Sequence, residues 1–370
     1  MSFTDPDQTR KPPPIISILM PVFNGEAYLH KTINSILSQT FQSFELLCIN
    51  DCSTDGSLSV VNFYKNKDDR VKVFTTYRNL GIVPKVINFI IPNIRGEFFV
   101  YASQDDLFSE DWLEKMLNRA VETDSDAVIP DLVFYSEDES GNINNNKNLI
   151  GVNGDRDIVI SNRDGVILSL DWTIPGNAMW RVWIIRKFPM ETFGMYADEY
   201  SVRVWFLNCN KIAFCDGVFY YRIDNPNAIS KKFSPKLFDY PYNCYMLYGF
   251  LTKNGFNEDV CRKQIENAID SLYAMKELLI SSGGAIANEF ILDADSRLFQ
   301  CFMALKNARF HPESMSRYKI FIRFQLLRFF GYHVFSMVCR GLTFIHQPGL
   351  LVRKHKGCRE KVDEEAALRR

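Results

Sequence analysis

The sequence of 370 residues lacks the short motifs that mark most cofactor and catalytic sites. It has no GxGxxG after an apolar run, so a dinucleotide site of the usual kind is not expected. It also has no GxxxxGKS or GxxxxGKT, no HExxH and no GxSxG. Only five histidines are present, and four of them lie beyond residue 300. The fifth, His30, falls on the surface of an expected helix, so the chemistry of this chain must depend on carboxylates.

Other absences limit the class of protein. The formal net charge is -1, so no global field would attract nucleic acid or an acidic partner. The nine cysteines are irregularly spaced without a CxxC pair, which predicts reduced, mostly buried thiols in a cytoplasmic protein. The first 14 residues are polar and proline-rich, and we expect a disordered leader and no targeting segment. No uncharged apolar run approaches the roughly 20 residues of a membrane span.

Apolar runs alternate with helical patterns through the first hundred residues. Strands are expected over 15–20, 44–49, 71–74 and 98–102, with helices over 26–39, 57–65 and around 86–90. This alternation predicts an α/β fold with a doubly wound, mainly parallel sheet, in which ligands bind at the carboxyl ends of the strands. Asn24, Asn50–Asp51 and Asp105–Asp106 each follow one of these strands, so polar side chains should converge at that edge.

The second half of the chain divides less clearly. Strands are expected at 127–135 and 158–160 around an asparagine-rich hairpin loop at 140–148, and later at 212–214 and 218–222. Helices are expected at 164–170 and from about 198 to before Lys211. Beyond Pro235 the pattern becomes helical. We therefore predict a leader (1–14), a sheet domain (15–234), a helical domain (235–316) and a basic aromatic tail (317–370).

The tail is rich in aromatic and aliphatic residues and cations and carries almost no acid over 317–356. Such a segment can lie in the interface of an anionic membrane. The alternative is a helical hairpin that packs on the preceding helices and exposes a few arginines. The sequence leaves both open.

Adjacent acids follow the apolar run at 98–102. Two carboxylates at the end of a buried strand are costly unless a cation lies there, and hard cations such as Mg²⁺ or Mn²⁺ bind through carboxylates and substrate phosphates. Asp105 and Asp106 therefore indicate a divalent metal, whereas Glu110 and Asp111 suit a helix start. Asp51 could accept from a nucleotide base or could form an Asx-turn that feeds the next helix.

The segments PVFNGEAYL, CINDCSTDGS, RNLGI and SQDD, in this order and spacing, resemble glycosyltransferase family 2, of the GT-A fold and the bacterial surface-polysaccharide type. The resemblance covers roughly residues 15 to 231. It implies that Pro21, Phe23 and Asn24 border the nucleoside with Glu26 following, that Asp51 contacts the base, and that Asn79 and Gly81 close over the donor. It also implies that Asp105 binds the metal with Asp106 beside it. The family's first aspartate falls on Ser103, so one expected ligand is absent.

The family also implies a catalytic base. Transfer with inversion is a single displacement in which a carboxylate takes the proton of the attacking hydroxyl. Asp198 matches the catalytic aspartate and Glu199 is one step away, with the register uncertain by one residue. Two acids in a first helical turn are the alternative.

Further residues could line the pocket. Gly176–Ala178 resemble the family's sugar-pocket segment, Trp180 could stack on an acceptor sugar, and Trp183 and Trp205 suit the core. Arg222 and Lys231–Lys232 lie where a mobile loop could clamp the diphosphate, or they are loop charges facing solvent.

Together these patterns predict an inverting hexosyl or related transferase of cell-surface polysaccharide synthesis. Its partners would be a nucleotide-diphosphate sugar, a saccharide or lipid-linked acceptor and an anionic membrane surface at the inner face of the cell membrane, with Mg²⁺ or Mn²⁺ as cofactor. A catalytically silent sugar-nucleotide or saccharide-binding protein is the alternative, suggested by Ser103. A nucleotidyltransferase would need a basic glycine-rich loop after the first strand, and PVFNGEAYL has no lysine or arginine.

Overall fold

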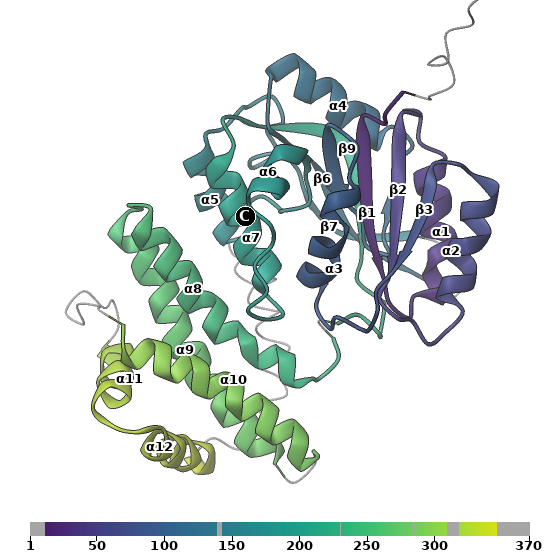
Figure 1. Ribbon diagram of the computed structural model, residues 1–370. Helices are drawn as coiled ribbons and strands as arrows, with labels where there is room; N and C mark the ends of the chain where they lie inside the picture. Colours follow the sequence, from purple (N-terminus) through teal and green to yellow (C-terminus); the bar gives the residue numbers. More distant parts are fainter. Residues whose placement is uncertain (1–11, 139–142, 230, 284–285, 309–317, 346–370) are drawn as a thin grey trace, which may run out of the picture. The chain divides into compact units, whose positions relative to one another are not determined.

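The computed structural model describes residues 12–138, 143–229, 231–283, 286–308 and 318–345 (Figure 1). The chain forms two compact units. The sheet unit comprises Met1–Phe193 and Ala197–Ala228, and the helical unit comprises Gly194–Tyr196 and Ile229–Arg370. The expected leader and the asparagine-rich turn at 139–142 lie outside the described residues, except for residues 12–14 of the leader. The predicted domain limits stay predictions.

The first half of the sheet is parallel, as the alternating pattern predicts. It comprises β1 (Ile16–Val22), β2 (Phe44–Asn50), β3 (Val71–Thr75) and β4 (Phe98–Tyr101). β1 pairs with β2 and β4, and β2 pairs with β3, all in parallel. Every residue of β2 is buried, which explains its continuous apolar run. The carboxyl ends of these strands therefore meet at one edge.

The second half of the sheet is mixed. The order is β3-β2-β1-β4-β8-β6-β9-β5, and β7 pairs with β6. Here β8 (Met179–Arg181) is antiparallel to β4 and to β6 (Ala127–Glu137), whereas β9 (Ile212–Arg222) is parallel to β6. The two-residue β5 (Leu107–Phe108) is antiparallel to β9 and was not predicted. The α/β class is as expected, and the sheet is parallel from β1 to β4 and mixed beyond.

Three local expectations were wrong. Much of the asparagine-rich segment expected as a loop is a strand, β7 (Ile143–Leu149), paired antiparallel with β6. Most of β7 is exposed, so backbone hydrogen bonds rather than apolar packing place it, and the sequence gives no periodic signal. Residues 158–160 form no strand beyond a single bridge from Ile160 to Ile212. The two strands expected at 212–214 and 218–222 are one, β9.

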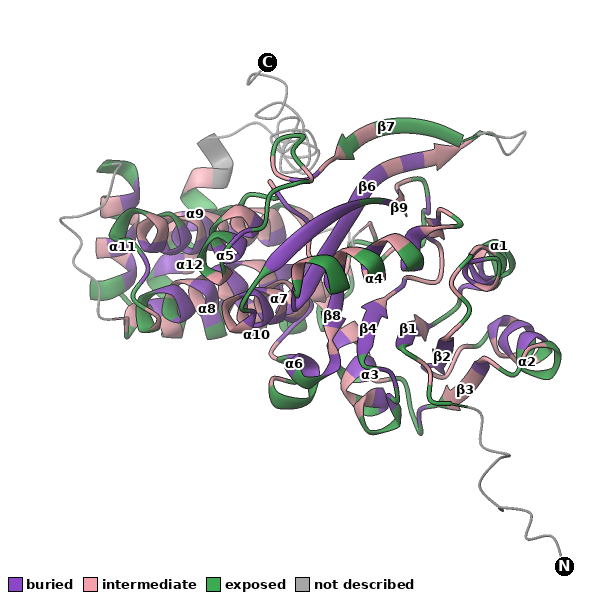
Figure 2. Cartoon of the chain, turned by 90° about the horizontal axis from the view of Figure 1, so that it is seen from above, coloured by how far each residue is buried: buried purple, intermediate pink, exposed green. Residues whose placement is uncertain are grey.

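Helices cover both faces of the sheet (Figure 2). One face packs on α1 (Glu26–Leu37), α2 (Ser57–Lys67) and α4 (Trp112–Thr123) in a shared apolar core. α3 (Val83–Ile90) contacts β1 and β2 on the other face, followed by η1 (Ile91–Asn93). On that face the ring of Phe99 from β4 lies 5.5 Å from Trp205 of α7 (Ala197–Asn208). α5 (Asn162–Leu170) and α6 (Val182–Lys187) pack on α7.

The helical unit has its own core. Its elements are η2 (Pro235–Asp239), α8 (Tyr240–Lys253), α9 (Glu258–Ser282), α10 (Asn288–Lys306), α11 (Tyr318–Phe329) and α12 (Tyr332–Ile345). The inner faces of α11 and α12 share the apolar core of α9 and α10. The eight cysteines of the described residues are free thiols and all but Cys52 are buried, as expected. No helix in the described ranges combines the length and apolar character needed to cross a bilayer.

Candidate active site

A glutamine from the loop after β4 forms two hydrogen bonds with the backbone of the loop after β1. The Phe23 amide donates to Oε1 of Gln104 at 2.8 Å, and Gln104 Nε2 donates to the Phe23 carbonyl at 3.0 Å. Asn24 adopts a left-handed conformation (φ 50°), and its Oδ1 accepts from the Thr54 amide at 2.8 Å. The sequence prediction placed Phe23 and Asn24 at this edge but missed Gln104, which joins the two loops.

The loop after β2 is tied to the first turn of α1. The Glu26 carboxylate accepts from the Gly56 amide at 2.8 Å, while the Glu26 amide donates to Asp55 at 3.2 Å. Asp55 also accepts from the Ser57 amide at the start of α2. Glu26 thus lies at the predicted edge, where its carboxylate fixes the start of α2. Pro21 lies on β1, one residue before its end.

Asp51 organises the loop that follows β3. It is 4% exposed, and its Oδ1 accepts from the Thr76 hydroxyl at 2.8 Å and the Leu80 amide at 2.9 Å. Asn79 Nδ2 donates to the Asp51 carbonyl at 3.2 Å, and Gly81 follows with a left-handed φ of 81°. The structure therefore brings Asp51, Asn79 and Gly81 together.

The two acids after β4 point in different directions. Asp106 is 2% exposed, and its Oδ1 accepts from the Arg222 amide at 3.0 Å. Burial, and then the charge of Asp105, raise the pKa of Asp106 well above its usual range. Asp105 is half-buried, and its Oδ2 accepts from Asn225 Nδ2 at 2.6 Å. Asp105 is therefore the acid of this pair that a ligand can reach.

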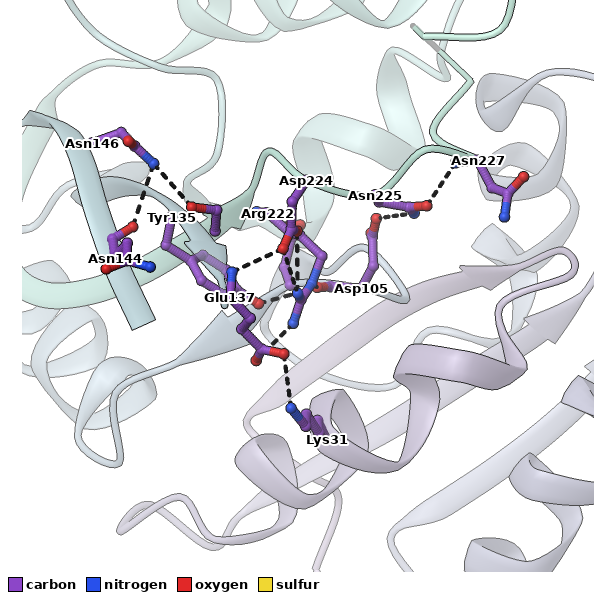
Figure 3. A network of polar contacts seen from close by, with 12 residues as sticks. Lys31, Asp105, Tyr135, Glu137, Asn144, Asn146, Arg222, Asp224, Asn225 and Asn227 are labelled. Atoms are coloured by element: carbon purple, nitrogen blue, oxygen red, sulfur yellow. Dashed lines mark hydrogen bonds and ion pairs between the residues drawn. The ribbon is translucent and has the colours of Figure 1, made fainter. Parts of the chain in front are cut away.

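Arg222 lies behind the Asp105 loop, at the end of β9 (Figure 3). Its side chain is 2% exposed and pairs with Glu137 at 2.9 Å and Asp224 at 3.2 Å. Its Nε donates to the Asp105 carbonyl at 2.9 Å. The structure thus gives this guanidinium three protein partners, and it is not the exposed loop cation that the sequence suggested as a diphosphate clamp.

Two aromatic rings contact the Arg222 guanidinium, and a further cation joins its network through Glu137. It lies 4.9 Å from the ring centroid of Tyr28 and 4.8 Å from that of Tyr135. Lys31 of α1 bonds to Glu137 at 2.8 Å, so the network extends from β9 through β6 to α1 (Figure 3). These elements are far apart in sequence, and no local pattern indicated that they meet.

The other acidic pair begins α7. Glu199 pairs with Arg203 one turn further along, and Arg203 is 5% exposed. Asp198 is half-buried. Burial, and then the negative charge of Glu199, raise the pKa of Asp198 to about 7. A carboxyl group with a pKa near neutrality suits proton transfer.

Tyr101 connects the two acidic pairs. It is the last residue of β4. Its pKa is raised first by burial and then by the charges of Asp198, Asp106 and Asp105. The first turn of α7 and the loop after β4 therefore share one electrostatic environment at the carboxyl end of β4.

The donor set fits a metal shared with a substrate, not a cage built by the protein. Within the described residues no group of three or more His, Cys, Asp or Glu side chains could hold an ion. Asp105 offers one carboxylate, whereas Asp106 is buried against Arg222. Magnesium-type ions commonly bind through one or two carboxylates plus substrate phosphates, and Asp105 satisfies that minimum.

The tryptophans correct two expectations. Trp180 is 1% exposed and packs 5.4 Å from Trp205 and 4.9 Å from Phe206, so it cannot stack on an acceptor. Trp205 is in the core as expected, but Trp183 is 40% exposed.

The other pocket segments were placed by resemblance alone. A Cβ on Gly176 would lie 2.8 Å from Val202, so glycine permits this segment to pack against α7. Lys231–Lys232 belong to the helical unit.

The sheet order, with acids at the ends of β4 and at the start of α7, defines a GT-A fold. A solved structure supports this: S. aureus TarS 1–349, in complex with UDP-GlcNAc, superposes with a TM-score of 0.60 over 85% of this chain and 90% of that chain. The sequences are 17% identical, so the likeness concerns the fold.

Sequence comparison finds one family model. Residues 17–187 match the model of glycosyl transferase family 2. An uncharacterized glycosyltransferase of Haemophilus influenzae is 42% identical over 105 residues, which are 28% of this chain and 42% of that protein. The putative teichuronic acid biosynthesis glycosyltransferase TuaG of Bacillus subtilis is 29% identical over 109 residues, 30% of this chain and 43% of that protein. The chain thus spans less than half of either relative.

Proposed function

We propose that this protein moves a sugar from a nucleotide-diphosphate sugar to a saccharide or lipid-linked acceptor, with inversion at the anomeric carbon. One observation carries the proposal. The negative charges of Asp198, whose own pKa is raised to about 7, and of Asp105 both raise the pKa of Tyr101 at the carboxyl end of β4. A proton acceptor and a phosphate-side carboxylate are the two groups that such a transfer needs. The family match over residues 17–187 and the TuaG relative support cell-surface polysaccharide synthesis.

The loops after β1, β2 and β3 would bind the nucleoside. Phe23 is 45% exposed and offers an aromatic face beside Pro21 and Asn24. Asp51 would accept from the base while it holds the loop of Asn79 and Gly81 in place. A uridine nucleotide is the first candidate, because TarS forms a complex with UDP-GlcNAc.

Asp105 would hold a divalent cation such as Mg²⁺ or Mn²⁺. When bound, the ion would neutralise charge on the leaving diphosphate. Asn225 fixes the Asp105 carboxylate, and Arg222 fixes its backbone carbonyl. Asp106 takes no part as a ligand, because it is buried against the Arg222 amide.

Asp198 would be the base. Its ionised carboxylate accepts the proton of an acceptor hydroxyl as that oxygen bonds to the anomeric carbon, while the bond from that carbon to the diphosphate oxygen breaks. Glu199 is the other candidate, but its pairing with buried Arg203 commits it to the helix. We therefore assign the proton transfer to Asp198.

An anionic membrane surface is part of the proposal, because a lipid-linked acceptor would be presented there. The protein would then work as a peripheral enzyme at the inner face of the cell membrane.

The test is metal-dependent turnover of UDP-GlcNAc, UDP-glucose and GDP-mannose by the full chain and by Asp198→Asn, Glu199→Gln and Asp124→Asn. Asp124→Asn is the control. The Asp124 side chain is 85% exposed, and its backbone has a left-handed conformation that asparagine also tolerates. We expect Asp198→Asn to lose activity about 10²-fold or more, with donor binding retained. Wild-type protein that binds donors but never turns one over would instead support a silent binding protein. Full activity in Asp198→Asn would move the base elsewhere.

A further inference from the structure

The outward face of α11 is apolar where a solvated helix would be polar. Tyr318, Ile322 and Phe329 are 78%, 40% and 75% exposed. Their spacing of i, i+4 and i+11 places them in one stripe along the helix. The opposite stripe enters the core of the helical unit and contains Ile320, Phe324 and Leu327. The helix is thus apolar on both sides, and only the inner side has a partner among the described residues.

The connection and α12 also expose apolar residues. Phe330, just after α11, is 44% exposed, and Lys306 of α10 donates to its carbonyl at 3.0 Å. On α12, Val334 and Met337 are 38% and 58% exposed at a spacing of i, i+3. Phe335 and Cys339 are buried on the inner side of the same helix, so α12 also turns apolar residues outward.

The charge on this surface is of one sign. Residues 318–345 contain no aspartate or glutamate. Lys319 and Arg328 are exposed and lie about 100° and 80° to either side of the Tyr318 stripe at helical spacing. Arg323 is not part of this set, because it turns inward and pairs with Asp270 at 2.6 Å. Aromatic residues flanked by cations without acids match the interface of an anionic bilayer.

We propose that this surface, the α11–α12 face, binds the surface of an anionic phospholipid bilayer. It is made of Tyr318, Lys319, Ile322, Arg328, Phe329, Phe330, Val334 and Met337. The aromatic and aliphatic side chains enter the headgroup boundary, and Lys319 and Arg328 contact lipid phosphates. The inference rests on the proposed function for its purpose, the delivery of a lipid-linked acceptor, but binding to lipid does not require transfer.

A second copy of the chain fits this face less well. A symmetric dimer would place the same patch on both sides of the contact. Lys319 and Arg328 would then face an equally cationic patch with no acid in it to pair with them. An anionic bilayer removes that conflict, because its phosphates supply the opposite charge along the whole face.

The test is flotation of the full chain with vesicles of phosphatidylcholine alone and of phosphatidylcholine with phosphatidylglycerol. We expect binding to the anionic vesicles only. Lys319→Glu with Arg328→Glu should weaken it more than tenfold, since each basic residue near such a surface contributes about fivefold in affinity. Ile322→Ser with Phe329→Ser should weaken binding to the same vesicles without changing net charge.

Single-residue controls carry the same kinds of change elsewhere. Val121→Ser alters a residue 72% exposed on the sheet unit, and Lys253→Glu alters the end of α8. Neither should change flotation. Urea unfolding of every variant, followed on the same samples, reports folding without a donor and separates this inference from the proposed function. Absence of wild-type flotation, or equal flotation of all variants, would overturn the proposal. So would a wild-type dimer that Phe329→Ser dissociates and that does not bind vesicles.

Discussion

The loop after β4 and the first turn of α7 each present two adjacent acids, and each pair divides in the same way. In the loop, Asp106 is buried against the Arg222 amide, and Asp105 stays half-buried. In the helix, Glu199 is paired with Arg203, and Asp198 stays half-buried. In each pair one acid bonds to an arginine residue, Asp106 to the backbone amide of Arg222 and Glu199 to the side chain of Arg203. The negative charges of Asp105 and Asp198 both raise the pKa of Tyr101.

The environments of Asp105 and Asp198 differ, and the difference indicates a separate role for each carboxylate. Asp105 is fixed from two sides, by Asn225 on its carboxylate and by Arg222 on its carbonyl. Asp198 is instead perturbed by burial and by Glu199, which raise its pKa to about 7. A rigid carboxylate suits a metal ligand, and a carboxyl group with a near-neutral pKa suits a base.

We expect the largest effect on turnover and Mn²⁺ binding when Asp105→Asn is compared with Asp106→Asn. Asp105→Asn removes the accessible carboxylate, so we expect Mn²⁺ binding in the presence of UDP to be lost and turnover to fall about 10²–10³-fold. Asp106→Asn should lower turnover less than tenfold, because Asp106 is 2% exposed and its Oδ1 already accepts from the Arg222 amide. Calorimetric Mn²⁺ titration and turnover of the two variants would decide. Equal losses would mean that Asp106 is also a ligand.

Arg222 gives the next test, on stability. Arg222→Met would leave Glu137 and Asp224 without the guanidinium that pairs them, and removing one partner of a buried pair costs about 3 kcal/mol or more. Lys115→Met is a matched control, since Lys115 also pairs with two acids, Asp111 and Asp216, but is 34% exposed. That control should cost less than about 1 kcal/mol. Urea unfolding of both variants measures the contrast, and similar losses would remove Arg222 from its central place.

The sequence predicted the loops at the ends of β1 to β4 much better than it predicted the network around Arg222. β1 to β4 and their polar ends were predictable, because a buried parallel strand is a local apolar run and its ligand loop follows at once. The Arg222 network was not, because Lys31, Glu137 and Arg222 come from α1, β6 and β9 and meet only in the folded sheet. The Asn225 contact with Asp105 spans 120 residues and has no local signal.

The pH dependence of stability and of turnover should report the raised pKa of Asp198. Its folded pKa of about 7 exceeds its ordinary 3.8, so the native state binds the extra proton between those values. Ionisation of Asp198 should therefore destabilise the fold as the pH rises from 4 to 7. We expect Asp198→Asn to raise the melting temperature at pH 8 more than at pH 5. Wild-type turnover should fall about tenfold for each pH unit below 7, because only the ionised form accepts a proton.

Two controls accompany this test. Asp124→Asn changes an exposed acid and should shift the melting temperature equally at both pH values. Donor binding followed across the same range would show whether a loss of turnover reflects the base or the donor. A melting-temperature gain for Asp198→Asn that is the same at pH 5 and pH 8 would contradict the raised pKa.

Substitution of Asn225 should give the smallest effect on metal binding, and it tests directly how the Asp105 carboxylate is oriented. Asn225 is 4% exposed, and its Oδ1 accepts from the Asn227 amide at 2.8 Å, which turns its Nδ2 toward Asp105. Asn225→Ala frees the Asp105 carboxylate to rotate, and loss of such an orienting partner typically weakens metal binding about tenfold. The Mn²⁺ dissociation constant in the presence of UDP, measured by electron paramagnetic resonance, should rise accordingly. The KM for the donor should change less than kcat.

Asn227→Ala is the matched control for Asn225. Asn227 contributes its backbone amide to this turn, and its exposed side chain is not needed for that bond. We therefore expect unchanged Mn²⁺ affinity in Asn227→Ala. Asn225→Asp sharpens the comparison further, because it places a second carboxylate beside Asp105 in a site that lacks the acid expected at Ser103. If Asn225→Asp binds Mn²⁺ more tightly and Asn225→Ala more weakly, the segment after β9 completes the metal side of the site. If neither changes, Asp105 is positioned by Arg222 alone.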